Sequence, residues 1–229
     1  MGDAAARAAG SGQVIGLATL PLKDLEASIA ELDRAIARGF RGVALPAFAD
    51  GDYLGAPRFE ALWAGIEARS LPVFVHPDGA RDPWYQEYAL WNSVGQPVEE
   101  ARFLASMILE GMLERHPGLR IIVSHGGGYL PHYFGRLDRN VTNMPDSVRH
   151  ISRAPSEYLR DLYFDTCVYD VAVLDALIRR YGADHVVMGS DYPVGEREPV
   201  GFVRSAEGLG EAQLAAILGG NAARLFDAA

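Results

Sequence analysis

Three side chains able to bind a metal or move a proton each follow a short apolar run. His76, His125 and Asp191 come after the segments VFV, IIVS and VVMGS, respectively. Runs of this kind are typical of buried parallel strands, whose carboxyl ends share one face in α/β barrels. We therefore expect the three residues to converge at one site. Two imidazoles and a carboxylate suit zinc or another divalent transition metal.

Each of these residues also has a purely structural interpretation. His76 could be a strand-end histidine hydrogen-bonded to a loop, and Asp191 could be a helix N-cap. His125 is more distinctive, because the glycines 126–128 after it let the chain turn tightly and a ligand approach the backbone. The recurrence of the pattern at equivalent strand ends favours the functional interpretation.

The segment HGGG also occurs in the oxyanion hole of lipase-like hydrolases, which need a Gly-x-Ser-x-Gly elbow. No serine in this chain has glycine both two residues before it and two residues after it. The residue two positions before Ser93 is Trp91, and the residue two positions before Ser124 is Ile122. A dinucleotide-binding fingerprint is excluded as well, because Pro131 stands where its third glycine belongs.

The elements that would position these residues alternate along the whole chain. Apolar runs predict strands at 14–20, 42–46, 73–76, 121–125, 162–166 and 186–191. Helical patterns lie between them and after the last one. This alternation predicts one parallel α/β domain over residues 1–229, with residues 1–12 as a loose tail. We count six strand–helix units, whereas a closed barrel of this type needs eight.

Composition limits the class of protein and its partners. The chain has 229 residues, 49% of them apolar, and a formal net charge of −9 without a basic run. We therefore expect neither nucleic acid nor an anionic membrane as a partner. The N-terminus lacks the features of a secretory signal, and the single cysteine fits a reducing compartment, so we expect a cytoplasmic protein.

The stretch 78–96 is long for a connection between a strand and a helix, and it is rich in aromatic residues. It contains Trp84, Tyr85, Tyr88 and Trp91. Long loops of this kind are usually functional, so we expect this one to contribute to a binding site.

Several segments together resemble the amidohydrolase-related family, and most closely its aminocarboxymuconate-semialdehyde decarboxylase group. They are VFVHP, SHGGGYLPHYFGRLDR, SEYLRDLYFDT, GADHVVMGSDYPVGEREP and LGGNAARLF. The resemblance runs from about Val14 to the C-terminus. It implies a (β/α)8 TIM barrel with one divalent metal, usually zinc, and non-oxidative decarboxylation of a small unsaturated or aromatic acid.

The resemblance also implies roles for individual residues. His76 and Asp191 match metal ligands, and His125 matches the catalytic histidine that activates the metal-bound water. Arg136 matches an arginine that contacts the substrate carboxylate, in the same or a neighbouring subunit. Trp84 and Asn92 are the expected substrate contacts in the aromatic loop, and Asn92 stands where the group often has tryptophan.

One part of the family pattern is missing. The family begins with a strand that carries a His-x-His or Glu-x-His pair, and this chain has no two histidines two residues apart and none before His76. We therefore expect an incomplete barrel that lacks the first two units, binds metal weakly and forms a homo-oligomer. The alternatives to a decarboxylase are a metal-dependent hydrolase of a small cyclic ester or amide, and an inactive barrel that acts as a binding or oligomeric protein.

Overall fold

A six-stranded sheet forms the centre of the protein. The computed structural model describes residues 14–80 and 82–227, so the expected tail 1–12 lies outside the described residues. All neighbouring strands are parallel and follow one another in chain order, which confirms the predicted alternation. The strands are β1 (Leu17–Ala18), β2 (Gly42–Leu45), β5 (Val73–Val75), β6 (Ile121–Val123), β7 (Tyr163–Asp165) and β8 (Val186–Val187).

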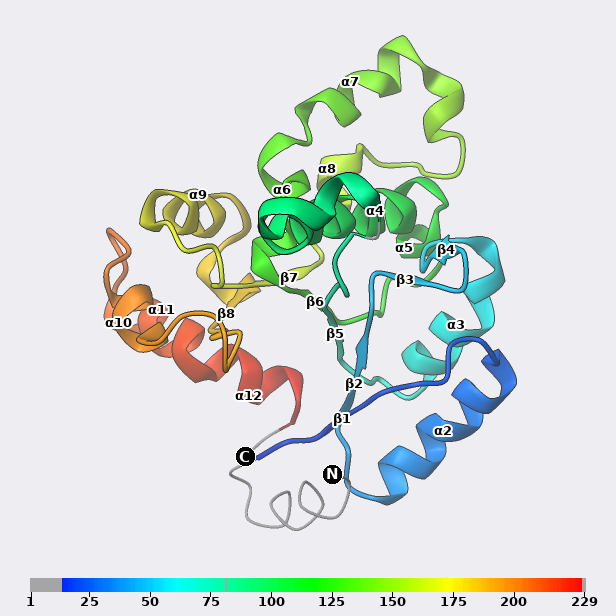
Figure 1. Cartoon of the computed structure of the whole chain (residues 1–229), viewed down its shortest axis with the longest axis horizontal. Coiled ribbons are helices and arrows are strands. Elements are labelled where there is room, and N and C mark those ends of the chain that lie inside the picture. The colour runs from blue at the N-terminus through cyan, green and yellow to red at the C-terminus, as the bar shows by residue number, and fades with distance from the viewer. Residues whose placement is uncertain (1–13, 81, 228–229) are drawn as a thin grey trace.

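Helices connect the strands, and several of them pack buried apolar side chains against one side of the sheet (Figure 1). They are α2 (Leu25–Ala37), α3 (Glu60–Ala68), α4 (Gln96–Leu109), α5 (Met112–Arg115), α6 (Leu130–Tyr133), α7 (Gly135–Asn143), α8 (Pro155–Leu159), α9 (Val171–Tyr181), α10 (Pro199–Arg204), α11 (Glu211–Ala215) and α12 (Asn221–Leu225). Among the described residues, no helix combines the length and the apolar character needed to cross a membrane.

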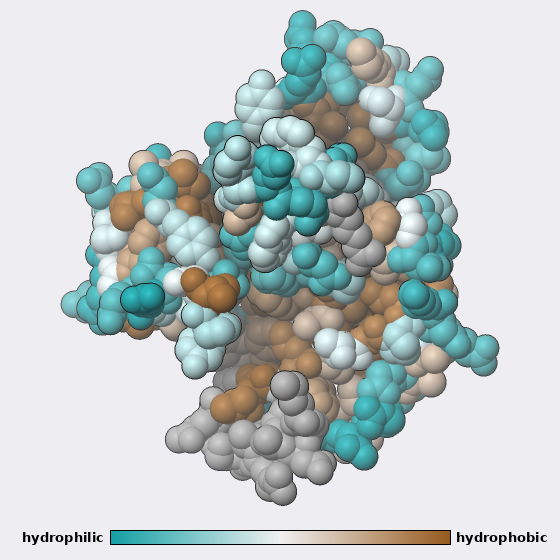
Figure 2. Space-filling model, in the orientation of Figure 1, coloured by the Kyte–Doolittle hydropathy of each residue, from teal (hydrophilic) through white to brown (hydrophobic). Residues whose placement is uncertain are grey.

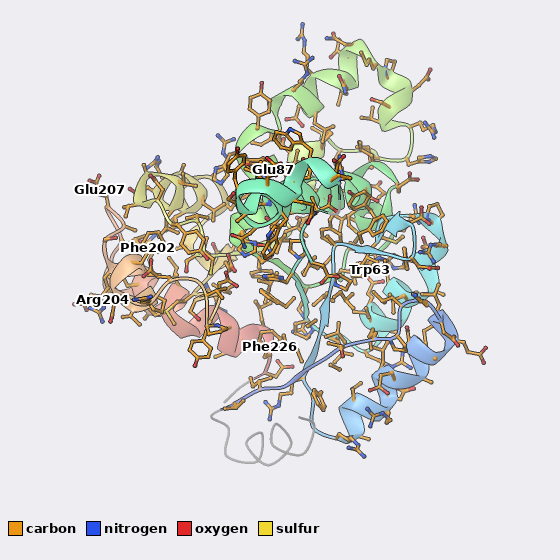
Figure 3. All side chains as sticks on the ribbon, viewed as in Figure 1. Trp63, Glu87, Phe202, Arg204, Glu207 and Phe226 are labelled. Atoms are coloured by element: carbon orange, nitrogen blue, oxygen red, sulfur yellow. The ribbon has the colours of Figure 1, made fainter. Side chains whose placement is uncertain are left out.

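The main core lies between the sheet and these helices. Alternate strand residues such as Val73, Val75 and Val123 are fully buried there against helix side chains. Burial of each such side chain stabilises the fold by about 1.5–3 kcal/mol. Trp63, labelled in Figure 3, packs into this layer from α3, and its indole N–H donates to the carbonyl oxygen of Leu54 at 2.7 Å.

The other strand residues point to the opposite face of the sheet and form a second, smaller cluster. Its buried members are Ile122, Val187 and Leu225, with Phe74, Tyr163 and Phe226 packed against them. Figure 2, drawn in the orientation of Figure 1, shows apolar residues in a recess near the middle of the molecule, where Figure 1 shows the strands. The sheet therefore has apolar side chains on both faces, as expected for a barrel wall.

The last helix and the residues after it are tied to two separate parts of the sheet. On the β8 side, the buried Asn221 amide donates to the carbonyl oxygens of Ala183 and Val186 at 2.7 and 2.6 Å. On the other side, Phe226 lies next to β2, as Figure 3 shows, and Arg41 donates to the carbonyl oxygen of Asp227 at 2.5 Å.

Three local features differ from the expectation. A short antiparallel pair, β3 (Phe48–Ala49) and β4 (Asp52–Tyr53), follows β2. The sequence between the third and fourth strands predicts one helix from Val98 to about Arg115. The structure divides it between α4 and α5, because Gly111 adopts a left-handed conformation with φ of 71°. The stretch 78–96 is helical in part, with a 3-10 segment at Pro83–Ala89 and a π-helical turn at Trp91–Gly95.

Candidate active site

His76, His125 and Asp191 lie together beyond the carboxyl ends of β5, β6 and β8. Nε2 of His76 is 3.7 Å from Oδ1 of Asp191, and Nε2 of His125 is 3.8 Å from Oδ2. One potential ligand atom from each residue lies within 4.8 Å of the others. These separations are too long for direct hydrogen bonds. The three polar groups therefore surround a common point without being hydrogen-bonded to one another. The expected convergence is confirmed, and the roles of the residues stay predictions.

Two of these residues have an unusual backbone conformation. The φ angles of His125 and Asp191 are 50° and 52°, in the left-handed region that non-glycine residues rarely adopt. Such a conformation costs about 1–3 kcal/mol and persists only where the surrounding structure imposes it. Around Asp191, the N–H groups of Val194 and Gly195 donate to its carbonyl oxygen, and the Tyr169 hydroxyl donates to Oδ2 at 3.1 Å.

A buried carboxylate on α4 holds the His125 ring. Nδ1 of His125 donates to Oε1 of Glu100 at 2.5 Å, and the Ser124 hydroxyl donates to the same oxygen at 2.8 Å. Burial raises the pKa of Glu100 to about 7, although the hydrogen bond from His125 acts in the opposite direction. Burial lowers the pKa of His125, but the hydrogen bond and charge of Glu100 outweigh it, so that pKa is raised.

A second buried carboxylate anchors the loop after His125. Oδ1 of Asp165, at the end of β7, accepts from the backbone N–H groups of Gly126 at 3.1 Å and Cys167 at 3.0 Å. Burial raises the pKa of Asp165 as well. The ends of β6 and β7 are thus joined directly beside the candidate site.

A cavity of about 740 Å³ opens beside His125 and Asp191. Its other lining residues are Asn92, Ser93, Gln96, Pro97, Gly128, Tyr129, His132, Cys167, Val168, Tyr169, Val173, Val194 and Gly195. Aromatic and apolar groups with a few polar side chains are typical of a pocket for a small organic ligand.

The three expected substrate contacts are placed differently. Asn92 lines the cavity, and its amide donates to the side-chain oxygen of Gln96 at 3.2 Å. Trp84 is 66% exposed and packs edge-on against Tyr85. Arg136 is exposed on α7. Neither Trp84 nor Arg136 is among the described residues that line this cavity.

Sequence patterns alone did not single out Glu100, although a signal was present. Glu100 lies on the buried side of α4 with the apolar residues Phe103, Leu104, Met107 and Ile108, and Gln96 and Glu99 are buried there as well. A glutamate on this side of the helix must be buried, and buried carboxylates are uncommon unless they are paired.

Comparison with known proteins gives consistent matches over the whole chain. The family model described as amidohydrolase matches residues 3–228. The 2-amino-3-carboxymuconate-6-semialdehyde decarboxylase of Dictyostelium discoideum is 32% identical over 214 residues, which are 91% of this chain and 59% of that protein. The chain therefore spans less than two thirds of that relative.

Solved structures agree in fold. The 5-carboxyvanillate decarboxylase of Sphingomonas paucimobilis matches with a TM-score of 0.90 and 28% identity, over 100% of this chain and 71% of that one. A dihydroxybenzoic acid decarboxylase from a Polaromonas species, solved with bound manganese and the inhibitor 2-nitroresorcinol, matches with a TM-score of 0.85 and 23% identity, over 99% and 75%.

Proposed function

Because this chain belongs to the amidohydrolase family, we propose that it takes part in the non-oxidative decarboxylation of a small aromatic or unsaturated carboxylic acid. The observation that carries the proposal is the convergence of His76, His125 and Asp191 beside a cavity of about 740 Å³. The relatives named as decarboxylases support the same reaction class.

The donor set fits a divalent metal. The His76 imidazole and the Asp191 carboxylate approach each other without a hydrogen bond between them, and this combination suits zinc, manganese and similar ions. We propose that His76 and Asp191 are ligands. A metal there would supply positive charge that binds and polarises the acidic substrate.

The residues of the cavity would then bind the acid and move a proton. The ring or conjugated chain of the substrate would lie among the apolar and aromatic side chains, with Asn92 as a polar contact. His125 would deliver a proton to the carbon that carries the carboxylate. As the bond to the carboxylate breaks, its electron pair remains on that carbon and forms the new C–H bond, and carbon dioxide leaves.

An assay of carbon dioxide release tests this function. The purified protein, supplied with Mn²⁺ or Zn²⁺, is incubated with carboxyvanillate, dihydroxybenzoate and aminocarboxymuconate semialdehyde. We expect turnover of at least one acid and a loss of about 100-fold or more in His125→Asn. His150→Asn, which changes an exposed histidine outside the cavity, is the matched control. A folded, metal-supplied protein that turns over none of these acids, or equal activity in His125→Asn, would contradict the proposal.

A second candidate is an inactive barrel that acts through association. The observation in its favour is that none of the six histidines belongs to a His-x-His pair. The parallel sheet has six strands among the described residues, and we propose that they form an incomplete single-domain barrel whose first two units are missing. Arg136 and Trp84 would then reach the substrate only through a neighbouring subunit or a movement of their segments.

Association can be measured independently of activity. Within residues 14–80 and 82–227, β1 and β8 are the two edges of the sheet, and exposed edges tend to pair with another chain. We therefore propose a homo-oligomer. Light scattering should show a dimer or larger species, and a monomer that does not bind dyes specific for apolar surface would oppose this proposal.

A further inference from the structure

We propose that Glu100 is a positioning residue that fixes the tautomer and ring orientation of His125, so that Nε2 is the nitrogen presented to the substrate. The inference rests on the proposed function, because it concerns the residue that would move the proton. Glu100 lies on α4, so it is not one of the three residues that converge at the ends of the strands.

The hydrogen bonds determine which nitrogen faces which group. Oε1 of Glu100 accepts from Nδ1 of His125 at 2.5 Å and from the Ser124 hydroxyl at 2.8 Å. The hydrogen bonds with His125 and Ser124 favour the charged form of Glu100. In that form both carboxylate oxygens can only accept, so Nδ1 carries the proton. In the neutral ring, Nε2 then holds the free electron pair, and in the charged ring Nε2 carries the proton that can be transferred.

The opposite edge of the ring points toward the candidate site. Nε2 of His125 is 3.8 Å from Oδ2 of Asp191, and the ring lies edge-on to that of His76, with the centroids 4.9 Å apart. The His125 side chain is only 9% exposed, so its ring has little room to rotate. Rotation by half a turn would also exchange a strong hydrogen bond to Glu100 for a contact with carbon.

The position of Glu100 is costly for stability, which argues against a purely structural role. Glu100 is fully buried, and its second oxygen, Oε2, has no hydrogen-bond partner among the described residues. Burying a carboxyl group with an unpaired oxygen opposes folding. An apolar residue would serve packing better on this side of α4, so the carboxyl group is better explained by its contact with His125.

Two substitutions at position 100 separate charge from hydrogen bonding. Glu100→Leu keeps the bulk and removes the acceptor, whereas Glu100→Gln keeps the shape and an oxygen that can accept from Nδ1. Glu99→Gln is the matched control. Glu99 is the neighbouring residue on α4, but it accepts from the Tyr53 hydroxyl at 3.0 Å and from Arg102 at 3.1 Å instead of from His125.

The tautomer is measured directly by nitrogen NMR of protein labelled in its histidine rings. The His125 signals are identified by their absence in His125→Asn. We expect protonated Nδ1 in the wild type and in Glu99→Gln, and a shift toward the Nε2–H tautomer in Glu100→Leu. In the assay of carbon dioxide release, Glu100→Leu should lose about 100-fold or more in kcat with KM changed by less than about threefold, and Glu100→Gln should lose less.

The possible results are distinct. A wild-type ring protonated on Nε2 instead of Nδ1, an unchanged tautomer in Glu100→Leu, or an altered tautomer with unchanged kcat would each overturn the inference. Melting curves verify folding, and Glu100→Met, which also lacks an acceptor, carries the same test if Glu100→Leu does not fold. An inactive wild type refutes only the proposed function, since the NMR measurement still decides where the proton of His125 lies.

Discussion

Gly128 and Pro97 approach so closely that a Cβ atom added at Gly128 would lie 2.3 Å from the carbonyl oxygen of Pro97. It would also lie 2.8 Å from Oε2 of Glu100, and Gly128 has a φ angle of +65°. A backbone oxygen at the start of a helix cannot move away cheaply. We predict that Gly128→Ala lowers the free energy of unfolding by about 3 kcal/mol, as measured by urea denaturation.

Gly135→Ala is the control for this prediction. A Cβ atom at Gly135, the first residue of α7, would have no heavy atom within 4 Å. Alanine favours helix over glycine by up to about 1 kcal/mol, so this variant should be as stable as the wild type or slightly more stable. Equal stability of the two variants would show that the contact with Pro97 is not as tight as described.

The second prediction concerns Asp165. Replacement by alanine leaves the buried N–H groups of Gly126 and Cys167 without their acceptor. Each unpaired buried donor costs about 1–3 kcal/mol, so we expect a loss of about 2–5 kcal/mol in the free energy of unfolding. Asp161→Ala removes an exposed ion pair with Arg153 and should cost less than about 1 kcal/mol. A smaller loss in Asp165→Ala than in Asp161→Ala would refute this account of the loop.

The third prediction is a pH dependence of stability. Glu60 binds Arg115 at 2.6 Å and His116 at 2.8 Å, and the hydrogen bond from Arg115 lowers the pKa of Glu60 below its ordinary value of 4.5. A lowered pKa stabilises the folded state above that value, and the contribution is lost as the pH falls through the folded-state pKa. Glu60→Gln should therefore be less stable than the wild type near pH 7, by about 1 kcal/mol or less because Glu60 is partly exposed.

Urea denaturation at a series of pH values provides the measurement. The difference in unfolding free energy between the wild type and Glu60→Gln should be constant above about pH 5 and should shrink below pH 4.5. A difference that grows as the pH falls would have the wrong sign for a lowered pKa.

The fourth prediction concerns metal affinity. The Tyr169 hydroxyl donates to Oδ2 of Asp191 and orients the carboxylate. Loss of such a supporting bond weakens metal binding by about 10-fold or more, so Tyr169→Phe should bind Mn²⁺ less tightly than the wild type in a calorimetric titration. Tyr133→Phe, at a tyrosine that is 72% exposed, should leave the affinity unchanged.

The wild type itself should bind metal weakly. A structural zinc site with its full set of ligands is worth about 10–16 kcal/mol near neutral pH, and only His76 and Asp191 are predicted ligands here. We expect dialysis against a mild chelator to remove the metal. Retention of one tightly bound ion per chain would show that other groups complete the site.

The strands and the three converging residues could be predicted because apolar side chains on both faces of the strands are buried or half-buried. A segment such as IIV has apolar side chains toward the helices and toward the inner cluster, so it reads as a continuous apolar run. The residue after such a run lies at the carboxyl end of the sheet. Position along the chain therefore determined position in space for His76 and His125.

The supporting residues could not be found in the same way. Tyr169 and Asp165 act through hydrogen bonds to segments far along the chain, and no local pattern encodes those contacts. The β3–β4 pair consists of two strands of two residues each, too short for a periodic pattern. The 3-10 segment Pro83–Ala89 has no buried residue, so no amphipathic repeat marks it in the sequence.

The attachment of α12 and the residues after it to two separate parts of the sheet has a consequence for folding. Arg41 holds the carbonyl oxygen of Asp227 across 186 residues of sequence, and Arg120 holds that of Leu225 across 105. Contacts of such long sequence separation raise the contact order and slow folding, because large loops must close before the contacts form. During synthesis, the inner cluster around Ile122 cannot be completed until Phe226 has left the ribosome. The nascent chain should therefore expose this apolar surface to chaperones until translation has passed Asp227.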